Sequence, residues 1–195
     1  MDLVRSLAQS YADSAALVSQ FASTPSEIEK TVKVSQKIAD AFNSGNKILI
    51  CGNGGSTCDA MHFAEEFTGR YRKNRRALPV ISLSDPSHIT CVGNDFGFDQ
   101  IFARGVDAFG KPGDILIGIS TSGNSQNIIN AVNLAKERQL GTIGLLGKDG
   151  GQLKGQCDVE FIIQEKTADR IQELHMTILH IIIEGVERIL FPELY

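Results

Sequence analysis

Five short, almost continuously apolar segments alternate with longer segments of helical periodicity, and this alternation constrains the fold more than any other feature of the sequence. The apolar segments are residues 47–52, 78–84, 114–120, 142–146 and 159–163. Strands that are apolar on both faces are typical of a parallel sheet covered by helices on both sides. The sequence therefore predicts an α/β fold, a three-layer, doubly wound and parallel five-stranded sheet of flavodoxin-like type.

Helical patterns fill the rest of the chain. Between and after the strands, helices are expected over residues 56–67, 126–139 and 167–190. Two extra helices precede the first strand, because apolar side chains recur at helical spacing in residues 2–22 and again after Pro25. Ser26 and Glu29 resemble a capping box that opens the second of these helices, and Gly45 stands where a helix would end.

Composition and organisation exclude several classes of protein. No repeat or linker divides the 195 residues, which predicts one domain over 1–195, with helices in 1–45 packing on the core and at an oligomer interface and an α/β core in 46–195. A net charge of −4 argues against a nucleic-acid binder. No apolar stretch approaches the roughly 20 residues that span a bilayer, and no signal peptide is visible. Four cysteines without C-x-x-C spacing suit reduced thiols, so we expect a cytoplasmic protein without nucleic-acid or membrane partners.

Two loops of glycine and hydroxyl residues follow predicted strands, at 52–57 and 120–125. Glycine lets backbone N–H groups approach a ligand closely, and a helix N-terminus favours an anion. The alternative is a pair of ordinary tight turns that cap the following helices. The first loop lacks the third glycine of G-x-G-x-x-G and the chain contains no P-loop, so we expect no nucleotide cofactor and a phosphate on another molecule.

Polar side chains interrupt two predicted helices. His62 and Glu66 are four residues apart and share one helical face, where they could converge on a proton or a metal ion or simply decorate the surface. Gln172, His175 and His180 lie in a helix otherwise rich in isoleucine and leucine. Buried polar groups need partners, so these histidines are either functional or hydrogen-bonded parts of the core.

Five segments of the chain together carry a family resemblance. They are CGNGGSTCDAMHFAEEFTGRYR (51–72), CVGNDFG (91–97), GDILIGISTSGNS (113–125), LLGKDGG (145–151) and DRIQELHMTILH (169–180). On these segments the chain resembles the sugar-isomerase (SIS) family of phosphosugar-binding domains, and within it the isomerases of heptose phosphates. The resemblance covers essentially the whole chain.

The resemblance implies a set of site residues. The substrate-binding positions are Asn53, Gly54, Gly55, Ser56, Glu66, Asn94, Asp95, Ser120, Thr121, Ser122, Ser125 and Gln172. The zinc positions are His62, Glu66, Gln172 and His180, with one Zn²⁺ per subunit, and Glu66 and His180 are the implied catalytic acid–base pair.

Two more candidates come from their places in the sequence. Arg70 follows the helix of His62 and could reach a substrate phosphate. It begins the dense basic segment 70–76, which otherwise reads as a solvated loop. Asp169 is a candidate to orient a substrate hydroxyl or a histidine.

The implied activity is an aldose–ketose isomerisation. Sedoheptulose 7-phosphate would become D-glycero-D-manno-heptose 7-phosphate by enediolate proton transfer, an early step of ADP-heptose and lipopolysaccharide core biosynthesis. The implied assembly is a homotetramer with active sites at subunit interfaces. Two alternatives remain open, a non-catalytic tetrameric adaptor that binds a replication initiator or senses a sugar phosphate, and an isomerase of a different sugar phosphate.

Helix geometry adds one expectation about the zinc positions. Gln172 and His180 are eight residues apart, which separates them by roughly 12 Å along one helix and by about 80° around it. We therefore do not expect both side chains of one chain to bind a single ion. We expect one site to draw them from different subunits, and we expect Gln172, whose carbonyl is a weak zinc ligand, to bind substrate more often than metal.

Overall fold

Five parallel strands form the centre of the computed structural model, which describes residues 2–195. Their order across the sheet is β2-β1-β3-β4-β5. Their bounds are β1 Ile48–Gly52, β2 Val80–Ser82, β3 Ile115–Ser120, β4 Gly141–Gly147 and β5 Val159–Ile163. Every neighbouring pair is parallel, and β1 and β3 are aligned so that Ile48 lies beside Ile115. The predicted five-stranded parallel sheet is confirmed.

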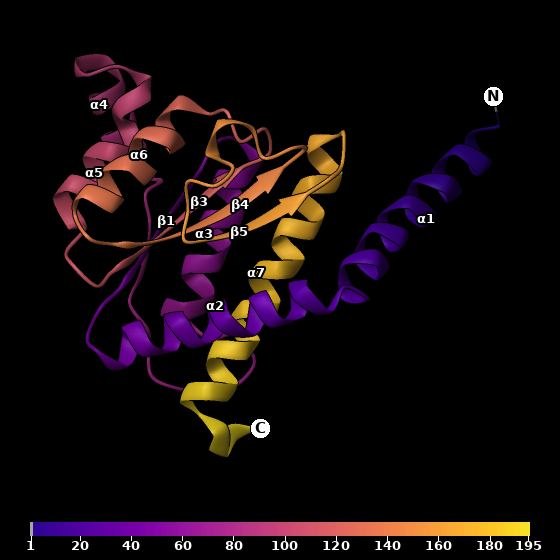
Figure 1. The fold of residues 1–195 in the computed structure, drawn as a ribbon, viewed down its shortest axis with the longest axis horizontal. Coiled ribbons are helices and arrows are strands. Elements are labelled where there is room, and N and C mark those ends of the chain that lie inside the picture. The colour runs from indigo at the N-terminus through magenta and orange to yellow at the C-terminus, as the bar shows by residue number, and fades with distance from the viewer. Residues whose placement is uncertain (1) are drawn as a thin grey trace.

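Helices cover both faces of this sheet, as Figure 1 shows. The helices are α1 Leu3–Ala22, α2 Pro25–Asn43, α3 Gly55–Thr68, α4 Pro86–Asp95, α5 Ile101–Phe109, α6 Gln126–Glu137 and α7 Ala168–Leu190, with short 3-10 turns at Phe98–Gln100, Gly151–Leu153 and Pro192–Leu194. Alternate side chains of a strand face opposite ways. Ile48 and Ile50 accordingly join one core with α2, α3 and α7, while Leu49 and Cys51 join another with α4, α5 and α6. The result is the expected three-layer arrangement.

The two N-terminal helices differ in how they are held. Helix α2 buries seven residues and packs across α7, whereas α1 buries none and extends away from the body of the molecule (Figure 1). Leu3, Val4, Leu7 and Tyr11 of α1 are all more than half exposed. Within residues 2–195, no helix combines the length and apolar character that crossing a bilayer requires.

The start of α2 corrects one sequence prediction. The helix begins at Pro25 with Thr24 at the N-cap, so Ser26 lies inside the first turn and forms no capping box. Proline at the first helical position lacks only an N–H that would be unpaired there, and its fixed φ suits the helix. The expected helix end is confirmed, because Gly45 has a φ of +74° directly after the C-cap Ser44.

Residues 86–109 form α4, a 3-10 turn and α5, which the periodicity did not reveal. This stretch contains Gly93, Gly97 and Gly105, and glycine weakens a helical pattern. Strand β2 is shorter than the apolar run 78–84. It pairs only with β1, and Pro79 just before it has no N–H to donate, which suits the edge of a sheet.

Candidate active site

The loop between β1 and α3 brings the backbone close to a side chain of α7. Gly54 has a φ of +57°, a conformation that favours glycine. A Cβ at Gly55 would lie 2.7 Å from Nε2 of Gln172, so the Gln172 amide rests directly on the first turn of α3. The glycines therefore leave room for this amide, and Gln172 lies at the loop that sequence analysis assigned to substrate.

The loop between β3 and α6 is tight and supported from outside. The Ser120 hydroxyl donates to Oγ of Ser125 at 3.2 Å, which closes the loop. At its centre Gly123 has a φ of +65°, and a Cβ there would lie 1.9 Å from the carbonyl oxygen of Gly150. The Leu153 N–H donates to the Gly123 carbonyl at 3.0 Å. The KDGG segment after β4 thus supports the expected phosphate loop by direct backbone contact.

Asn127 joins these two loops and was missed by sequence analysis. It is 2% exposed at the start of α6, and its side-chain amide exchanges two hydrogen bonds with the amide of Asn53. Its position just after the hydroxyl-rich loop could have indicated a role near that loop. An asparagine in the first turn of a helix is too common, however, for this position to be singled out from the sequence.

Helices α3 and α7 bring two histidines and a glutamate together. Nε2 of His62 lies 2.9 Å from Nε2 of His180 and 3.5 Å from Oε1 of Glu66. A third group, from a segment 118 positions away in the sequence, therefore meets the His62–Glu66 pair. Only 15% of the Glu66 side chain is exposed. The arrangement can hold a cation or move a proton.

The surroundings of these groups tune their protonation. Burial raises the pKa of Glu66 above its ordinary range, and the neighbouring Glu65 charge adds to this. Burial lowers the pKa of His180, and the nearby His62 and Arg72 charges act in the same direction. A carboxylate with a raised pKa beside a neutral imidazole is suited to general acid–base chemistry.

The donor set fits a zinc ion. The ligand atoms of His62, Glu66 and His180 all lie within 4.8 Å of one another, and two imidazoles with one carboxylate form a common zinc set. Nδ1 of His62 also lies 3.0 Å from Oε1 of Glu65. A carboxylate on that nitrogen fixes the ring so that Nε2 presents its lone pair to an ion. Glu65 is a second residue that sequence analysis missed, although its i+3 spacing from His62 was visible.

Gln172, the fourth residue that the resemblance implies for zinc, lies away from the histidine cluster in this chain. Gln172 rests on Gly55, which precedes His62 by seven residues and hence by roughly 10 Å along α3. This separation agrees with the expectation that Gln172 and His180 serve one ion only from different subunits. The statement concerns an assembly of chains and stays a prediction.

Ser56, another site candidate, is buried in the first turn of α3, whereas four further candidates are exposed. Asn94 and Asp95 lie at the end of α4, where the Asn94 amide donates to Asp95 at 2.7 Å. Asp169 lies in the first turn of α7, and a hydrogen bond from the Thr167 hydroxyl lowers its pKa. Arg70 lies in the segment that follows α3. All four are free to meet a ligand and do not touch the histidine cluster.

Two further residues prove structural. His175 is fully buried and Nε2 of its ring bonds the carbonyl of Leu146 at 3.0 Å, so the interpretation as a hydrogen-bonded core histidine is confirmed for this residue. The solvated-loop interpretation of the basic segment 70–76 is wrong for Arg75. Its side chain is 1% exposed and pairs with Glu187 of α7 at 2.8 Å.

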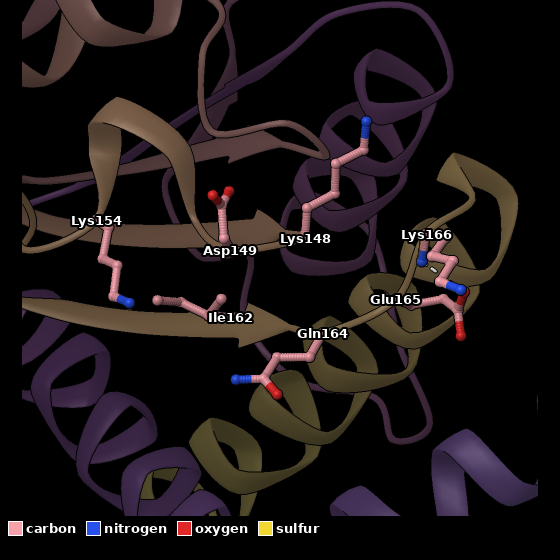
Figure 2. A pocket seen from close by; sticks show the side chains of 7 residues that line it. All are labelled: Lys148, Asp149, Lys154, Ile162, Gln164, Glu165 and Lys166. Atoms are coloured by element: carbon pink, nitrogen blue, oxygen red, sulfur yellow. Dashed lines mark hydrogen bonds between the residues drawn. The ribbon is translucent and has the colours of Figure 1, made fainter.

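A separate hollow opens at the ends of β4 and β5 (Figure 2). Its lining residues are Lys148, Asp149, Lys154, Ile162, Gln164, Glu165 and Lys166. Figure 2 shows that their side chains point in different directions and do not converge on one point. The hollow contains none of the histidines or hydroxyls described above.

Known proteins resemble this chain over nearly its whole length. The family model described as SIS domain matches residues 10–147. The phosphoheptose isomerase of Fusobacterium nucleatum is 65% identical over 189 residues, which cover 97% of each chain. A solved phosphoheptose isomerase from Francisella tularensis aligns with a TM-score of 0.91 at 32% identity, covering 96% of this chain and 100% of that one. A solved phosphoheptose isomerase from Neisseria gonorrhoeae aligns with a TM-score of 0.88 at 38% identity, covering 95% of this chain and 98% of that one.

Proposed function

This chain belongs to the SIS domain family and is a sugar phosphate isomerase, and on that premise we propose that it converts sedoheptulose 7-phosphate into D-glycero-D-manno-heptose 7-phosphate. The observation that carries the proposal is the convergence of Glu66 with the His62–His180 pair. His62 and Glu66 lie on α3, the helix that follows the first glycine loop, and His180 lies on α7.

The substrate phosphate binds at residues 120–125. Hydroxyls of Ser120, Thr121, Ser122 and Ser125 donate to it together with backbone N–H groups at the start of α6, whose dipole favours an anion. Hydroxyl groups of the sugar chain meet Asn53, Gly54, Gly55 and Ser56 in the first loop, and Gln172 above it. Arg70, Asn94, Asp95 and Asp169 complete the substrate contacts.

Proton transfer follows from the placement of Glu66. Its carboxylate removes a proton from C1 of the ketose while the C2 carbonyl oxygen gains one, which gives the enediol. The same carboxyl then returns its proton to C2, and the C1 hydroxyl loses a proton to become the aldehyde. His180, whose lowered pKa keeps it neutral, exchanges protons with the oxygen atoms. The sum is an isomerisation with no external reductant or oxidant.

A zinc ion would be held by His62, Glu66 and His180, with Gln172 contributed by another subunit. When bound, it supplies an electrophile that stabilises negative charge on the substrate oxygens. A carboxylate bound to zinc is a poorer base, so occupancy and base function alternate or are shared.

The proposed assembly is a homotetramer in the cytoplasm, with active sites between subunits and a place in the supply of heptose for lipopolysaccharide. The exposed apolar side chains of α1 support an oligomer, because a face of this kind gains free energy when another chain covers it. The relatives named as isomerases favour this function over a non-catalytic adaptor.

The direct test follows sedoheptulose 7-phosphate labelled with ¹³C at C2 by NMR, with arabinose 5-phosphate and fructose 6-phosphate as competing substrates. We expect conversion of the heptose phosphate, and a loss of kcat of about 10²- to 10⁴-fold in Glu66→Gln, because the amide cannot accept the C1 proton. Glu137→Gln, at the end of α6, is the matched control. Faster turnover of arabinose 5-phosphate or fructose 6-phosphate would show that the enzyme acts on a shorter sugar phosphate. No turnover of any of the three compounds would favour the non-catalytic adaptor.

A further inference from the structure

The basic segment 70–76 follows α3 and runs along one face of α7. The Tyr71 ring stacks on the His180 ring with centroids 5.9 Å apart and planes 25° from parallel. The Arg72 guanidinium pairs with Glu184 at 2.7 Å. The segment therefore touches the same helix that supplies the second catalytic residue.

Two more contacts extend this line toward the C-terminus. Nε of Arg75 donates to Oε1 of Glu187 at 2.8 Å, and the Arg76 guanidinium lies 5.8 Å from the centre of the Phe191 ring. The four contacted positions are His180, Glu184 and Glu187 of α7 and Phe191, which caps the end of this helix. Steps of three and four residues keep side chains on one face of a helix, so the contacts form a continuous stripe.

Arg75 also binds the end of the helix that carries Glu66. Its two terminal nitrogens donate to the backbone carbonyls of Glu66 and Phe67, each at 2.7 Å. The last carbonyls of a helix have no partner within the helix. Arg75 satisfies two of them, and with the same guanidinium it holds Glu187 of α7. One buried side chain thus fixes the end of α3 against α7.

The environment of this pair leaves little freedom. The side chains of Arg75 and Glu187 are each 1% exposed, and the Tyr195 hydroxyl donates to the second oxygen of Glu187 at 2.7 Å. Both carboxylate oxygens are therefore occupied. A planar guanidinium presents five N–H groups in fixed directions, whereas a lysine ammonium offers only three on a flexible stem. Lysine at this position could keep the charge but not the whole set of bonds.

We propose that Arg75 and Tyr71 are positioning residues of the isomerase, which set Glu66 and His180 at the distance that proton transfer requires. Arg75 acts through the backbone of Glu66 and through α7, and Tyr71 holds the plane of the His180 ring. The inference rests on the proposed function of Glu66 and His180. It assigns a role to a segment that its charge alone would place in solvent.

The variants separate position from folding. Arg75→Lys keeps the positive charge but removes the planar guanidinium and its set of fixed hydrogen bonds. The double variant Arg75→Met with Glu187→Met removes both buried charges together, a change that proteins tolerate. It takes the Arg75 partner from the Glu66 carbonyl and leaves the Phe67 carbonyl with the Leu78 N–H alone. Tyr71→Leu removes the stacking and Tyr71→Phe retains it. Arg138→Met, which breaks an exposed pair with Asp107 on the far side of the sheet, is the matched control.

Two measurements report on position. We expect Arg75→Lys, the double variant and Tyr71→Leu to lower kcat by about 10- to 100-fold with little change in KM, since a small displacement of a catalytic group has this effect. Tyr71→Phe and Arg138→Met keep the original kcat. In ¹⁵N-histidine NMR spectra, the first three variants shift the ring signals of His62 and His180, while those of His88 and His175 stay in place.

Unchanged His62 and His180 signals with unchanged kcat in folded variants would overturn the proposal. Shifts of all four histidines would also overturn it, because they indicate a general structural role. The NMR measurement needs no substrate. If the wild-type chain failed to turn over any sugar phosphate, the proposed function would fall while the effect of Arg75 on the histidine pair could still be read.

Discussion

The side-chain amides of Asn53 and Asn127 face each other and exchange two hydrogen bonds, both 2.9 Å long. One asparagine follows β1 and the other lies in the first turn of α6, so the pair joins the loop 52–57 to the residues directly after the loop 120–125. Each residue gives its N–H to the other's carbonyl oxygen. This exchange ties the two loops together.

The pair predicts that Asn127 controls substrate affinity. Asn127→Ala leaves the Asn53 amide without its buried partner, at a cost of about 1–3 kcal/mol that loosens the first loop. We expect KM to rise by about 10-fold while kcat changes little. Initial rates over a range of sedoheptulose 7-phosphate concentrations, compared with those of the wild-type protein, measure both constants.

Asn127→Asp sharpens this prediction. The aspartate still accepts from Asn53 but cannot donate back, and its negative charge lies beside the loop that binds phosphate. We expect a larger rise in KM than for alanine, because a buried charge at this position is weakly screened and repels the substrate phosphate. Equal KM values for all three proteins would show that the amide pair does not position the loop.

Sequence and structure agree most closely where periodicity is strong. The buried strands, their parallel pairing and the long α7 were predictable, because short, continuous apolar segments between helical patterns are typical of a parallel sheet. The family resemblance is confirmed by the comparisons. The spacing of His62 and Glu66 predicted a shared helical face. No local pattern could show that His180 lies 2.9 Å from His62, since this contact joins segments 118 positions apart.

The wrong prediction for Arg75 has the same origin, a contact between distant segments. Arg75 looked like one of several solvated charges, because its partner Glu187 is 112 positions away and only the packing of α7 removes both from water. The capping box at Ser26 failed for a local reason, since Pro25 is a better first residue for the helix. Local rules identify elements, and the contacts between elements decide which polar residues become a site.

Glu65 is predicted to tune metal affinity. Its carboxylate lies 3.0 Å from Nδ1 of His62, where it orients the ring and raises the basicity of Nε2. Loss of such an outer partner lowers metal affinity by about 10- to 100-fold. We therefore expect Glu65→Gln to bind Zn²⁺ more weakly than the wild type, measured by competition with a fluorescent zinc chelator.

Two controls define the origin of the effect. His62→Ala should remove binding further, and Glu173→Gln, on the exposed side of α7, should leave the zinc affinity as it is. A Glu65→Gln protein with wild-type affinity would contradict the orienting role. Failure of the wild type itself to bind Zn²⁺ would remove the metal from the proposed function and leave Glu66 as a base.

Gly123 is predicted to tolerate no side chain. An added Cβ would lie 1.9 Å from the Gly150 carbonyl oxygen, and the φ of +65° is strained for alanine. The backbone segments of Gly123 and Gly150 would have to move apart. Gly123→Ala should therefore lower the melting temperature, and it should raise KM because the proposed phosphate loop moves. Gly93→Ala is the comparison, since its Cβ meets nothing within 4 Å inside α4 and alanine favours a helix. A Gly123→Ala protein as stable as Gly93→Ala would refute the close contact.

His175 is predicted to make stability depend on pH. Burial lowers its pKa from 6.5 to about 4, against the weaker opposite effect of its bond to the Leu146 carbonyl. The folded chain therefore holds this ring neutral, while the unfolded chain protonates it below about pH 6.5. The unfolded state then binds more protons, so stability is complete above pH 6.5 and is lost as the pH falls toward 4.

The size of the loss follows from the same shift. Between pH 7 and pH 5 the free energy of unfolding should fall by about 2 kcal/mol through His175 alone. Urea unfolding followed by circular dichroism at one chain concentration measures it. His175→Gln can still donate to the Leu146 carbonyl but does not titrate, so its stability should fall by that much less over this range. If wild type and variant lose stability equally between pH 7 and pH 5, the buried ring is not the group that responds.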